Sequence, residues 1–274
     1  MELDKTTDTP LISVIMGIYN CADTLPKAVE CITNQSYRNW ELIMCDDCSK
    51  DSTLKVAKFL EKKDSRIKVI HNNENMTLAP TLNRCLAIAK GTYIARMDGD
   101  DTCSPERLEK EVVFLESHPE YAIVSCSMSL SNEEGIFRII EHKEQPEIRD
   151  FIYRNQHCHA GCMIRTDAIR TVHGYSESAK YKRVEDYDLW IRMYKSGYRG
   201  YNLKEVLYDM FDSEKALKRR SLSNRLNESR VIFEACQASK VSSFHYFRVA
   251  IPIVKWFVPT GVYRIQHIKN KQKG

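Results

Sequence analysis

The sequence predicts an α/β protein with a mostly parallel central sheet, helices on both faces of the sheet and a basic helical extension at its C-terminal end. Short apolar runs alternate with amphipathic segments throughout the first 100 residues, which is typical of parallel strands joined by helices. From residue 213 onward basic side chains dominate. We therefore expect a polar leader at residues 1–10, a main domain at 11–212 and a basic amphipathic helical tail at 213–274.

Composition and charge limit the class of protein. The 274 residues are 43% hydrophobic and 28% charged, as in a soluble globular protein with a substantial core. The sequence contains no apolar stretch long enough to span a membrane, and its first residues do not resemble a signal peptide. We therefore expect a cytoplasmic protein. Residues 214–274 carry a net charge of +10, which leaves −6 on the first 213 residues.

The first strand is predicted at residues 11–20, an apolar run that opens into a loop at Tyr19 and Asn20. Asp23 to Pro26 provide helix start signals, and apolar side chains follow them at helical spacing. The same reasoning predicts strands at 40–45, 66–70 and 92–97, and helices at 52–62 and 83–90.

The second half is predicted to be less regular. An amphipathic helix is expected at 105–117, strands at 121–126 and 161–165, and a short helix at 166–172. The last helix of the main domain begins near Glu185 and Asp186, because acidic side chains favour a helix N-terminus and an apolar face follows them.

An acidic cluster follows the strand at 92–97. Asp98, Asp100 and Asp101 place three carboxylates within four residues, with only Gly99 between them. Like charges this close raise one another's pKa, so such a cluster normally has a cation or a basic partner nearby. Oxygen ligands at this spacing suit Mg²⁺ or Mn²⁺. A solvated acidic turn is the alternative.

Polar side chains also follow two other predicted strands, at Tyr19–Asn20 and at Asp46–Asp47. Because the carboxyl ends of parallel strands form the ligand-binding edge of such sheets, these groups are expected to meet the acidic cluster there. The first strand is followed by neither a dinucleotide-binding glycine motif nor a P-loop. If a nucleotide binds here, a metal ion on the acidic cluster has to neutralise its phosphates.

Four motifs, in this order, resemble the family 2 inverting glycosyltransferases of the Rossmann-like GT-A fold. The likeness is greatest to bacterial members that build capsule, exopolysaccharide and O-antigen units, and it extends over residues 10–210. The four motifs are Ile15 to Asn20, Glu41 to Ser49, Gly91 to Asp101 and Glu185 to Trp190.

The resemblance implies a role for each motif. Tyr19 and Asp46 or Asp47 would hold the uracil and ribose of a UDP-sugar, and Asp186, paired with Glu185, would be the general base. Asp98, Asp100 and Asp101 would form the DxD-type motif that contacts the ribose and, through Mn²⁺ or Mg²⁺, the diphosphate. Asn20, Asn83, Arg84 and Gly99 complete the implied nucleotide-sugar site.

The sequence departs from the family pattern at two positions where a glycine is usual, Cys48 and Thr77. Both flank the implied nucleotide site, so the resemblance leaves the nucleotide contacts of these loops open.

The expected reaction is a single displacement at the anomeric carbon, which inverts its configuration. A carboxylate that takes the proton of the acceptor hydroxyl is typically worth about 10²–10⁴ in rate, and a divalent ion stabilises the departing diphosphate. These groups must lie on opposite sides of the sugar. We therefore expect a nucleotide-binding half at residues 11–101 and an acceptor-binding half at 102–212, with His157, His159 and Tyr175 on the acceptor side.

The tail contains an apolar, aromatic run at residues 244–258 that Arg248, Pro252 and Lys255 interrupt. Such a run does not span a bilayer, but aromatic residues mixed with basic ones suit a helix at a membrane surface. We expect a peripheral protein on the inner face of the cell membrane that acts on a lipid-linked saccharide. A helical cap on the main domain, or an oligomer interface, is the alternative.

Two other functions were weighed. A nucleotidyltransferase would also use acidic strand ends and Mg²⁺, but residues 17–30 offer only Lys27 for a phosphate-binding loop. A nucleic-acid-binding protein would use the basic tail, yet the acidic main domain would repel a polyanion. The motifs do not name the sugar: galactose and N-acetylglucosamine are slightly favoured over glucose and N-acetylgalactosamine.

Overall fold

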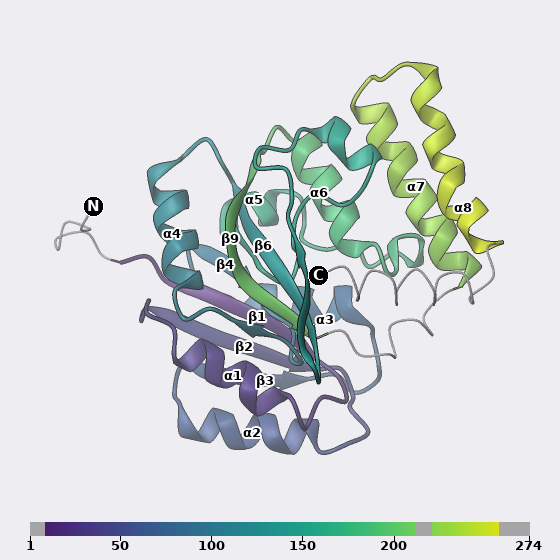
Figure 1. Ribbon diagram of the computed structural model, residues 1–274. Helices are drawn as coiled ribbons and strands as arrows, with labels where there is room; N and C mark the ends of the chain where they lie inside the picture. Colours follow the sequence, from purple (N-terminus) through teal and green to yellow (C-terminus); the bar gives the residue numbers. More distant parts are fainter. Residues whose placement is uncertain (1–8, 212–220, 258–274) are drawn as a thin grey trace.

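The computed structural model describes residues 9–211 and 221–257 and contains one nine-stranded sheet with the order β3-β2-β1-β4-β8-β6-β9-β5, in which β7 pairs with β6 (Figure 1). The first half is parallel, as expected. Its strands are β1 (Ile12–Ile18), β2 (Trp40–Asp46), β3 (Ile67–His71) and β4 (Tyr93–Arg96), and its helices are α1 (Leu25–Thr33), α2 (Thr53–Lys63) and α3 (Leu78–Ile88).

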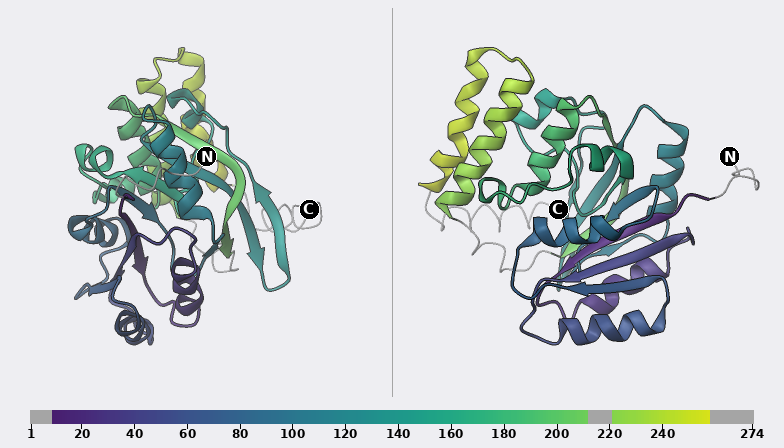
Figure 2. Two further views of the ribbon diagram at one scale, coloured as in Figure 1. Left: turned by 90° about the vertical axis from the view of Figure 1, so that its left-hand side faces the viewer. Right: turned by 180° about the vertical axis from the view of Figure 1, so that it is seen from behind.

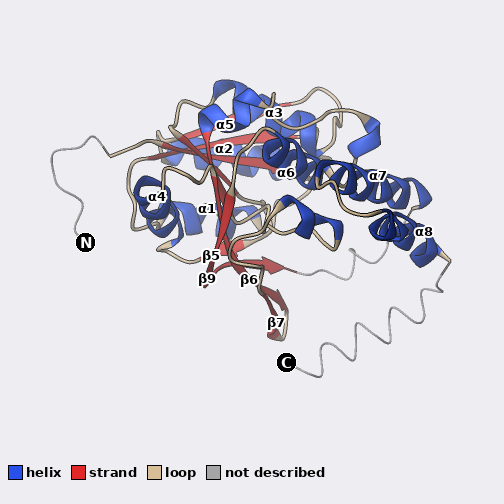
Figure 3. Ribbon diagram, turned by 90° about the horizontal axis from the view of Figure 1, so that it is seen from above, coloured by secondary structure: helices blue, strands red, loops and turns tan. Residues whose placement is uncertain are grey.

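Helices cover both faces of this sheet, which confirms the predicted α/β class. Alternate strand residues enter different cores, because successive side chains of a strand point to opposite faces. Val14 and Met16 pack against α1, whereas Ile15 packs against α3 on the other face. Figure 3 shows the strands as a central layer between helices, with one hairpin extending beyond them.

The second half mixes parallel and antiparallel pairs: β8 runs antiparallel to β4 and β6, whereas β9 runs parallel to β6. Its strands are β5 (Thr102–Cys103), β6 (Ile123–Asn132), β7 (Gly135–Ile140), β8 (Cys162–Arg165) and β9 (Gly200–Phe211). Its helices are α4 (Arg107–Ser117), α5 (Thr166–Thr171) and α6 (Glu185–Lys195), with the short 3₁₀ turns η1 (Ile148–Ile152) and η2 (Ala179–Tyr181).

Two elements differ from the sequence prediction. Helix α3 begins at Leu78 rather than at residue 83, because Pro80 lies in its first turn, where the missing N–H is not needed. Strand β9 was not predicted, because polar residues from Asn202 to Glu205 interrupt its apolar pattern. This strand pairs with β6 along nearly its whole length and brings Tyr208 and Phe211 to the acidic cluster.

Three further elements follow, namely α7 (Leu222–Ala238), the 3₁₀ segment η4 (Ser243–Ala250) and α8 (Ile251–Trp256). They form one side of the molecule in the right-hand view of Figure 2. Val231, Ile232 and Ala235 of α7 belong to the same core as α3, α5 and α6. Helix α7 therefore packs on the main domain across the expected boundary near residue 212. Leader residues 1–8 and the tail residues Lys215, Lys218, Arg219 and Arg220 lie outside the described ranges.

Within residues 9–211 and 221–257, no helix is long and apolar enough to cross a membrane. All ten cysteines are free thiols.

Candidate active site

The carboxyl ends of β1, β2 and β4 lie side by side, since β1 pairs in parallel with both of the other strands. Tyr19 follows β1 directly and is 47% exposed, so its ring is available for a flat ligand. The next residue, Asn20, connects the loops after β1 and β2. Its backbone N–H donates to Ser49 Oγ at 3.0 Å, and its side-chain oxygen accepts from the backbone N–H of Lys50 at 2.8 Å.

The two aspartates after β2 have different tasks. Asp47 accepts three hydrogen bonds, from the side chain of Asn72 and from the backbone N–H groups of Met76 and Thr77 at 2.7–2.9 Å. It therefore fixes the loop that precedes α3. Asp46 accepts one bond from the backbone N–H of Ser49, and its Oδ1 is buried without a partner among the described residues. Of the two, Asp46 keeps an oxygen for a ligand.

Cys48 and Thr77, the two positions where the family usually has glycine, both have a positive φ. Cys48 has a φ of +58° and Thr77 has a φ of +73° with a ψ of 177°. The conformation of Thr77 is one that glycine adopts almost exclusively, and it typically costs about 1–3 kcal/mol for other residues. The bonds from Asp47 to the N–H groups of residues 76 and 77 hold this strained turn in place.

Asn83 and Arg84, expected at the nucleotide, are used by the fold. Asn83 bonds both the backbone N–H and the carbonyl of Tyr175, at 2.9 and 2.8 Å, and donates to Glu177. Arg84 donates to the carbonyl of His71 at 2.8 Å and to Asn72. Asn83 therefore ties α3 to the turn at residues 174–177, and Arg84 holds the end of β3.

The acidic cluster after β4 has a buried basic partner that the sequence analysis missed. Arg96, the last residue of β4, is fully buried and forms an ion pair with Oδ1 of Asp98 at 2.7 Å. Asp98 remains partly exposed and Asp100 is exposed, so both carboxylates reach solvent at the end of the strand. Gly99 between them is closely packed, because a Cβ there would lie 3.0 Å from Cys21 Sγ.

Asp101 is built into the protein. Its Oδ2 accepts from the hydroxyl of Tyr208 at 2.8 Å, and its Oδ1 accepts from the backbone N–H of Phe211 at 2.9 Å. Burial, with the neighbouring charges of Asp98 and Asp100, raises the pKa of Asp101 to about 8. The Tyr208 hydroxyl also accepts from the backbone N–H of Asp98 at 3.2 Å. Tyr208 thus orients the cluster from β9, the strand that the sequence analysis did not identify.

A second buried cation, Arg107, contacts both Arg96 and Tyr208, the two residues that hold the acidic cluster. Arg107 of α4 donates to the carbonyl of Arg96 at 2.8 Å, and its guanidinium lies 5.3 Å from the centre of the Tyr208 ring. Glu111 pairs with it at 3.1 Å, and both side chains are completely buried.

The cluster fits a divalent cation in charge and in donor type. The mutual repulsion that raises the pKa of Asp101 would fall if a cation were bound to Asp98 and Asp100. No group of three or more His, Cys, Asp or Glu side chains in residues 9–211 and 221–257 is placed to hold a metal by itself. The three aspartates thus form no ready-made metal site, and a bound ion would need other ligands, such as phosphate oxygens and water.

The expected base lies in the first turn of α6. Oδ2 of Asp186 accepts from the side-chain amide of Asn155 at 2.7 Å, which holds the carboxylate in one orientation. Burial, together with the charge of Glu185, raises the pKa of Asp186 to about 6, whereas the positive charge of Arg96 acts to lower it. Arg96 therefore acts on carboxylates in both halves of the site.

The three residues expected on the acceptor side separate into two groups. His157 is a core residue: its ring nitrogens bond to Asn202 and Tyr194 at 2.7 and 3.1 Å, and burial lowers its pKa to about 4. Because no ring nitrogen is left for a ligand, the expectation for His157 is wrong. His159 is partly exposed and shares a 2.9 Å hydrogen bond with the hydroxyl of Tyr175. Burial raises the pKa of the Tyr175 hydroxyl well above its usual value and lowers that of the His159 ring, and the charge of the nearby Arg96 acts to lower both.

The sequence is similar to known proteins over most of its length. The model of the family described as "Glycosyl transferase family 2" matches residues 13–173. The putative glycosyltransferase EpsE of Bacillus subtilis is 42% identical over 271 residues, which is 97% of each chain. An Escherichia coli protein, UDP-Glc:alpha-D-GlcNAc-diphosphoundecaprenol beta-1,3-glucosyltransferase WfaP, is 31% identical over 72% of this chain and 75% of its own.

Two solved structures share the fold. Residues 1–349 of TarS from S. aureus, in complex with UDP-GlcNAc, superpose with a TM-score of 0.70 at 19% identity, covering 87% of this chain and 70% of that one. The mannosyltransferase PcManGT from Pyrobaculum calidifontis, in complex with GDP-Man and Mn²⁺, gives a TM-score of 0.63 at 15% identity, covering 96% and 81%.

The strained turn before α3 predicts a stabilising substitution. Thr77→Gly removes the backbone strain and no side-chain hydrogen bond, while glycine costs about 0.5–1 kcal/mol in chain entropy. We expect a gain of about 1 kcal/mol in the free energy of unfolding and a Tm higher by about 2–4 °C in thermal denaturation. Thr92→Gly is the control, because Thr92 is not among the residues with a positive φ. An equal or lower Tm for Thr77→Gly would show that the turn is not strained.

The raised pKa of Asp186 predicts the pH dependence of activity. A base must be ionised to accept a proton, so kcat/KM should rise about tenfold per pH unit below pH 6 and level off above it. Because the Glu185 charge helps to raise this pKa, Glu185→Gln should move the rise to lower pH. A pH–rate profile measured with saturating metal tests both statements, and an unchanged profile in Glu185→Gln would contradict the assignment of Asp186.

Proposed function

The chain belongs to glycosyl transferase family 2, and from this membership and the geometry of the site we propose that it is an inverting, metal-dependent enzyme that uses a UDP-sugar. It is a glycosyltransferase of polysaccharide biosynthesis. The proposed reaction moves a hexose or an N-acetylhexosamine to a hydroxyl of a lipid-linked saccharide. The observation that carries the proposal is the partly buried Asp186, held by Asn155 and close to Arg96 at the end of β4. Neither a nucleotidyltransferase nor a nucleic-acid-binding protein is supported by this family membership.

The donor nucleotide would lie along the carboxyl ends of β1, β2 and β4. Tyr19 offers an exposed ring for the uracil, and Asp46 offers a buried, unpartnered oxygen for an N–H or hydroxyl donor of the nucleoside. UDP as the nucleotide is supported by the fold shared with TarS, which was solved with UDP-GlcNAc, and by WfaP, which is named for its use of UDP-Glc.

Asp98 and Asp100 would hold the Mn²⁺ or Mg²⁺, since their carboxylates reach solvent, whereas both oxygens of Asp101 already accept hydrogen bonds. The bound ion would neutralise negative charge on the departing diphosphate. The shared fold of the Mn²⁺-bound mannosyltransferase is consistent with this choice.

Asp186 would remove the proton from the acceptor hydroxyl. The hydroxyl oxygen forms its bond to the anomeric carbon while the bond from that carbon to the UDP oxygen breaks, and the electron pair leaves with UDP. Attack from the face opposite UDP inverts the anomeric configuration. Tyr175 and His159 would lie beside the acceptor, because Tyr175 is close to Asp186 and Arg96 and shares a hydrogen bond with His159.

A lipid-linked acceptor suggests that the enzyme works on the inner face of the cell membrane, and η4 and α8 carry a suitable surface. Phe244, Phe247 and Phe257 are 75%, 51% and 77% exposed. The guanidinium of Arg248 lies over the rings of Phe247 and Tyr153, at 5.5 and 4.6 Å from their centres. Exposed aromatic rings next to basic side chains suit the headgroup region of an anionic bilayer.

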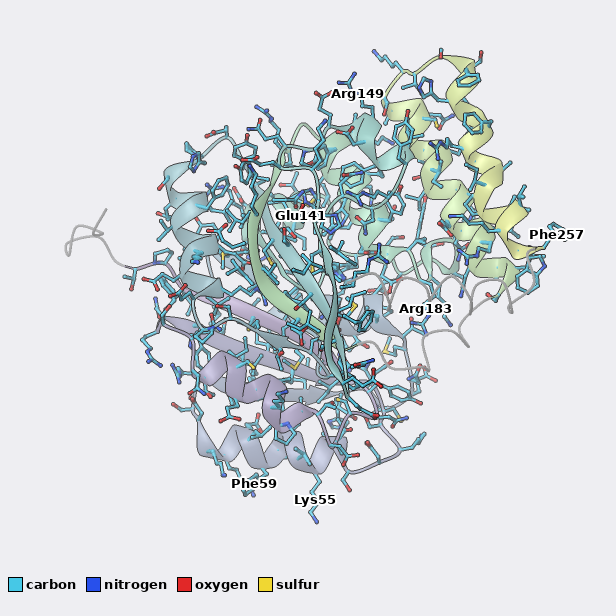
Figure 4. The ribbon with its side chains drawn as sticks, in the orientation of Figure 1. Lys55, Phe59, Glu141, Arg149, Arg183 and Phe257 are labelled. Atoms are coloured by element: carbon cyan, nitrogen blue, oxygen red, sulfur yellow. The ribbon has the colours of Figure 1, made fainter. Side chains whose placement is uncertain are left out.

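Donor and metal binding should be coupled. In calorimetric titrations, UDP should bind in the presence of Mn²⁺ and bind at least tenfold more weakly with EDTA, because the described carboxylates form no three-ligand metal site without phosphate. The double variant Asp98→Asn/Asp100→Asn should lose the effect of Mn²⁺. Glu141→Gln, at an exposed position directly after β7 (Figure 4), should behave as wild type. Absence of UDP binding under all these conditions would refute the donor assignment.

Membrane attachment should depend on the aromatic surface. In co-sedimentation with vesicles of anionic and zwitterionic phospholipid, replacing Phe244, Phe247 and Phe257 with Ser should weaken binding about tenfold or more. Phe59→Ser is the matched control, because Phe59 is 55% exposed on α2 and lies far from Phe257 in Figure 4. Equal binding of both variants would contradict this part of the proposal.

A further inference from the structure

The segment that carries His157 lies along one side of α6. Asp186, Trp190 and Tyr194 follow one another at intervals of four residues, so their side chains project from the same side of this helix. The side-chain amide of Asn155 donates to Oδ2 of Asp186 at 2.7 Å. The His157 ring packs edge-on against Trp190, with 5.3 Å between the ring centres, and its Nε2 lies 3.1 Å from the hydroxyl of Tyr194. The segment therefore contacts three successive turns of α6, beginning at the proposed base.

The hydrogen bonds of the His157 ring define its tautomer. Burial lowers the pKa of this ring to about 4, so the ring is neutral, with one donor and one acceptor nitrogen. The amide nitrogen of Asn202 donates to the carbonyl of Gln156 at 2.9 Å, so the amide oxygen accepts from Nδ1 of His157 at 2.7 Å. Nε2 then accepts from the hydroxyl of Tyr194, which itself accepts from the backbone N–H of Gly200 at 3.1 Å. The ring therefore joins α6 to β9.

Other bonds fix the backbone on either side of His157. The side chain of Gln156 donates to the carbonyls of Asp150 and Arg154 at 2.8 and 3.1 Å, and the hydroxyl of Tyr187 on α6 donates to the carbonyl of Phe151. The chain from η1 to His157 is thus held to α6 at both ends. A segment fixed in this way can hold a side chain in one orientation.

The orientation of the Asn155 amide follows from its two partners. Its oxygen accepts from the backbone N–H of His157 at 3.4 Å, so the nitrogen faces Oδ2 of Asp186. A donor on a carboxylate favours the ionised form. It also restricts the rotation of the carboxylate, which determines where its other lone pairs point. Asn155 is therefore placed to control both the charge and the direction of the proposed base.

The charged and titratable groups around Asp186 come from several elements. Glu185 precedes it on α6, Arg96 approaches from the end of β4, and the hydroxyls of Tyr175 and Tyr187 are near it. Burial raises the pKa of both tyrosines well above the usual value, so these hydroxyls stay neutral while Asp186 titrates. The pH at which Asp186 ionises therefore depends on Glu185, on Arg96 and on the bonds that its carboxylate accepts.

We propose that Asn155 is a positioning residue for the base: its amide keeps the Asp186 carboxylate ionised and directed at the acceptor hydroxyl, and the buried His157 ring holds Asn155 in place. The inference rests on the proposed function, because it requires Asp186 to take the proton of the acceptor. It gives the His157 segment a role in the reaction that needs no contact between His157 and substrate.

The first test removes the amide. Asn155→Ala should lower kcat about tenfold or more, because the base is no longer aligned, and leave UDP binding in the presence of Mn²⁺ unchanged. The rise of the pH–rate profile should move to higher pH by about 0.5 pH unit, so the loss at acid pH is about threefold larger than on the plateau. Asn155→Gln, which keeps the amide, should return the rise to the wild-type pH. Asn132→Ala is the matched control, because Asn132 also accepts a backbone N–H bond, at 2.8 Å, but in the turn between β6 and β7.

The second test is a double-mutant cycle. His157→Phe keeps a ring against Trp190 and removes both ring hydrogen bonds, so it should lower kcat in the wild-type background. If His157 acts through Asn155, the same change should cause little further loss in Asn155→Ala. Thermal denaturation and UDP titration identify the folded variants. Should His157→Phe not fold, Tyr194→Phe replaces it in the cycle, because it removes the hydroxyl that bonds to the ring.

The outcomes separate the inference from the proposed function. If Asp186→Asn transfers sugar at the wild-type rate, Asp186 is not the base and the proposed function fails in that respect. If Asp186→Asn is inactive but Asn155→Ala lowers the rate by one factor at every pH, Asn155 has only a structural role and the inference is refuted. Additive losses in the double mutant would likewise overturn the part assigned to His157.

Discussion

The site depends on how the negative charges of the aspartates at the carboxyl ends of β2 and β4 are compensated. Asp46 ends β2, and Asp98, Asp100 and Asp101 follow β4; burial, together with the charges of Asp98 and Asp100, raises the pKa of Asp101 to about 8. The protein compensates part of this charge with the buried guanidinium of Arg96, the hydroxyl of Tyr208 and backbone N–H groups. Asp98 and Asp100 also reach solvent, where a metal ion and a diphosphate would further balance the negative charge.

In each acidic group, one carboxylate makes hydrogen bonds or an ion pair that fix the local structure, and another can still contact a ligand. Asp47 has three hydrogen bonds while Asp46 keeps an unpartnered oxygen. Asp101 is bonded on both oxygens, whereas Asp98 and Asp100 reach solvent. In α6, Asp188 is paired with the cation Arg192, while Asp186 is held by the neutral side chain of Asn155 and by backbone N–H groups of its own turn. The fold-serving carboxylates position the others, because they fix the loops and the helix from which those project.

The sequence predicts those strands and helices that follow from a local pattern of apolar and polar residues. The strands and helices of the first 100 residues follow from apolar periodicity and from start signals such as Asp23 to Pro26, and the four motifs gave the family. Pairings between distant segments could not be predicted in this way. Strand β9 has an interrupted apolar pattern, so Tyr208 was missed, and His157 looked like an acceptor contact until Asn202 and Tyr194 were found at its ring nitrogens. Nor could the sequence distinguish Asp46 from Asp47, because the difference lies in bonds to residues 72–77.

The stereochemistry of the product tests the account most directly. With Asp186 proposed on the acceptor side and the acidic strand ends on the nucleotide side, the hydroxyl would attack the face opposite UDP. Nuclear magnetic resonance of the disaccharide formed from an α-linked UDP-sugar, whichever one the enzyme accepts, measures the anomeric configuration. A β-linked product is predicted, and its loss in Asp186→Asn with retained UDP binding would identify the base. An α-linked product would contradict the single displacement and with it the role assigned to Asp186.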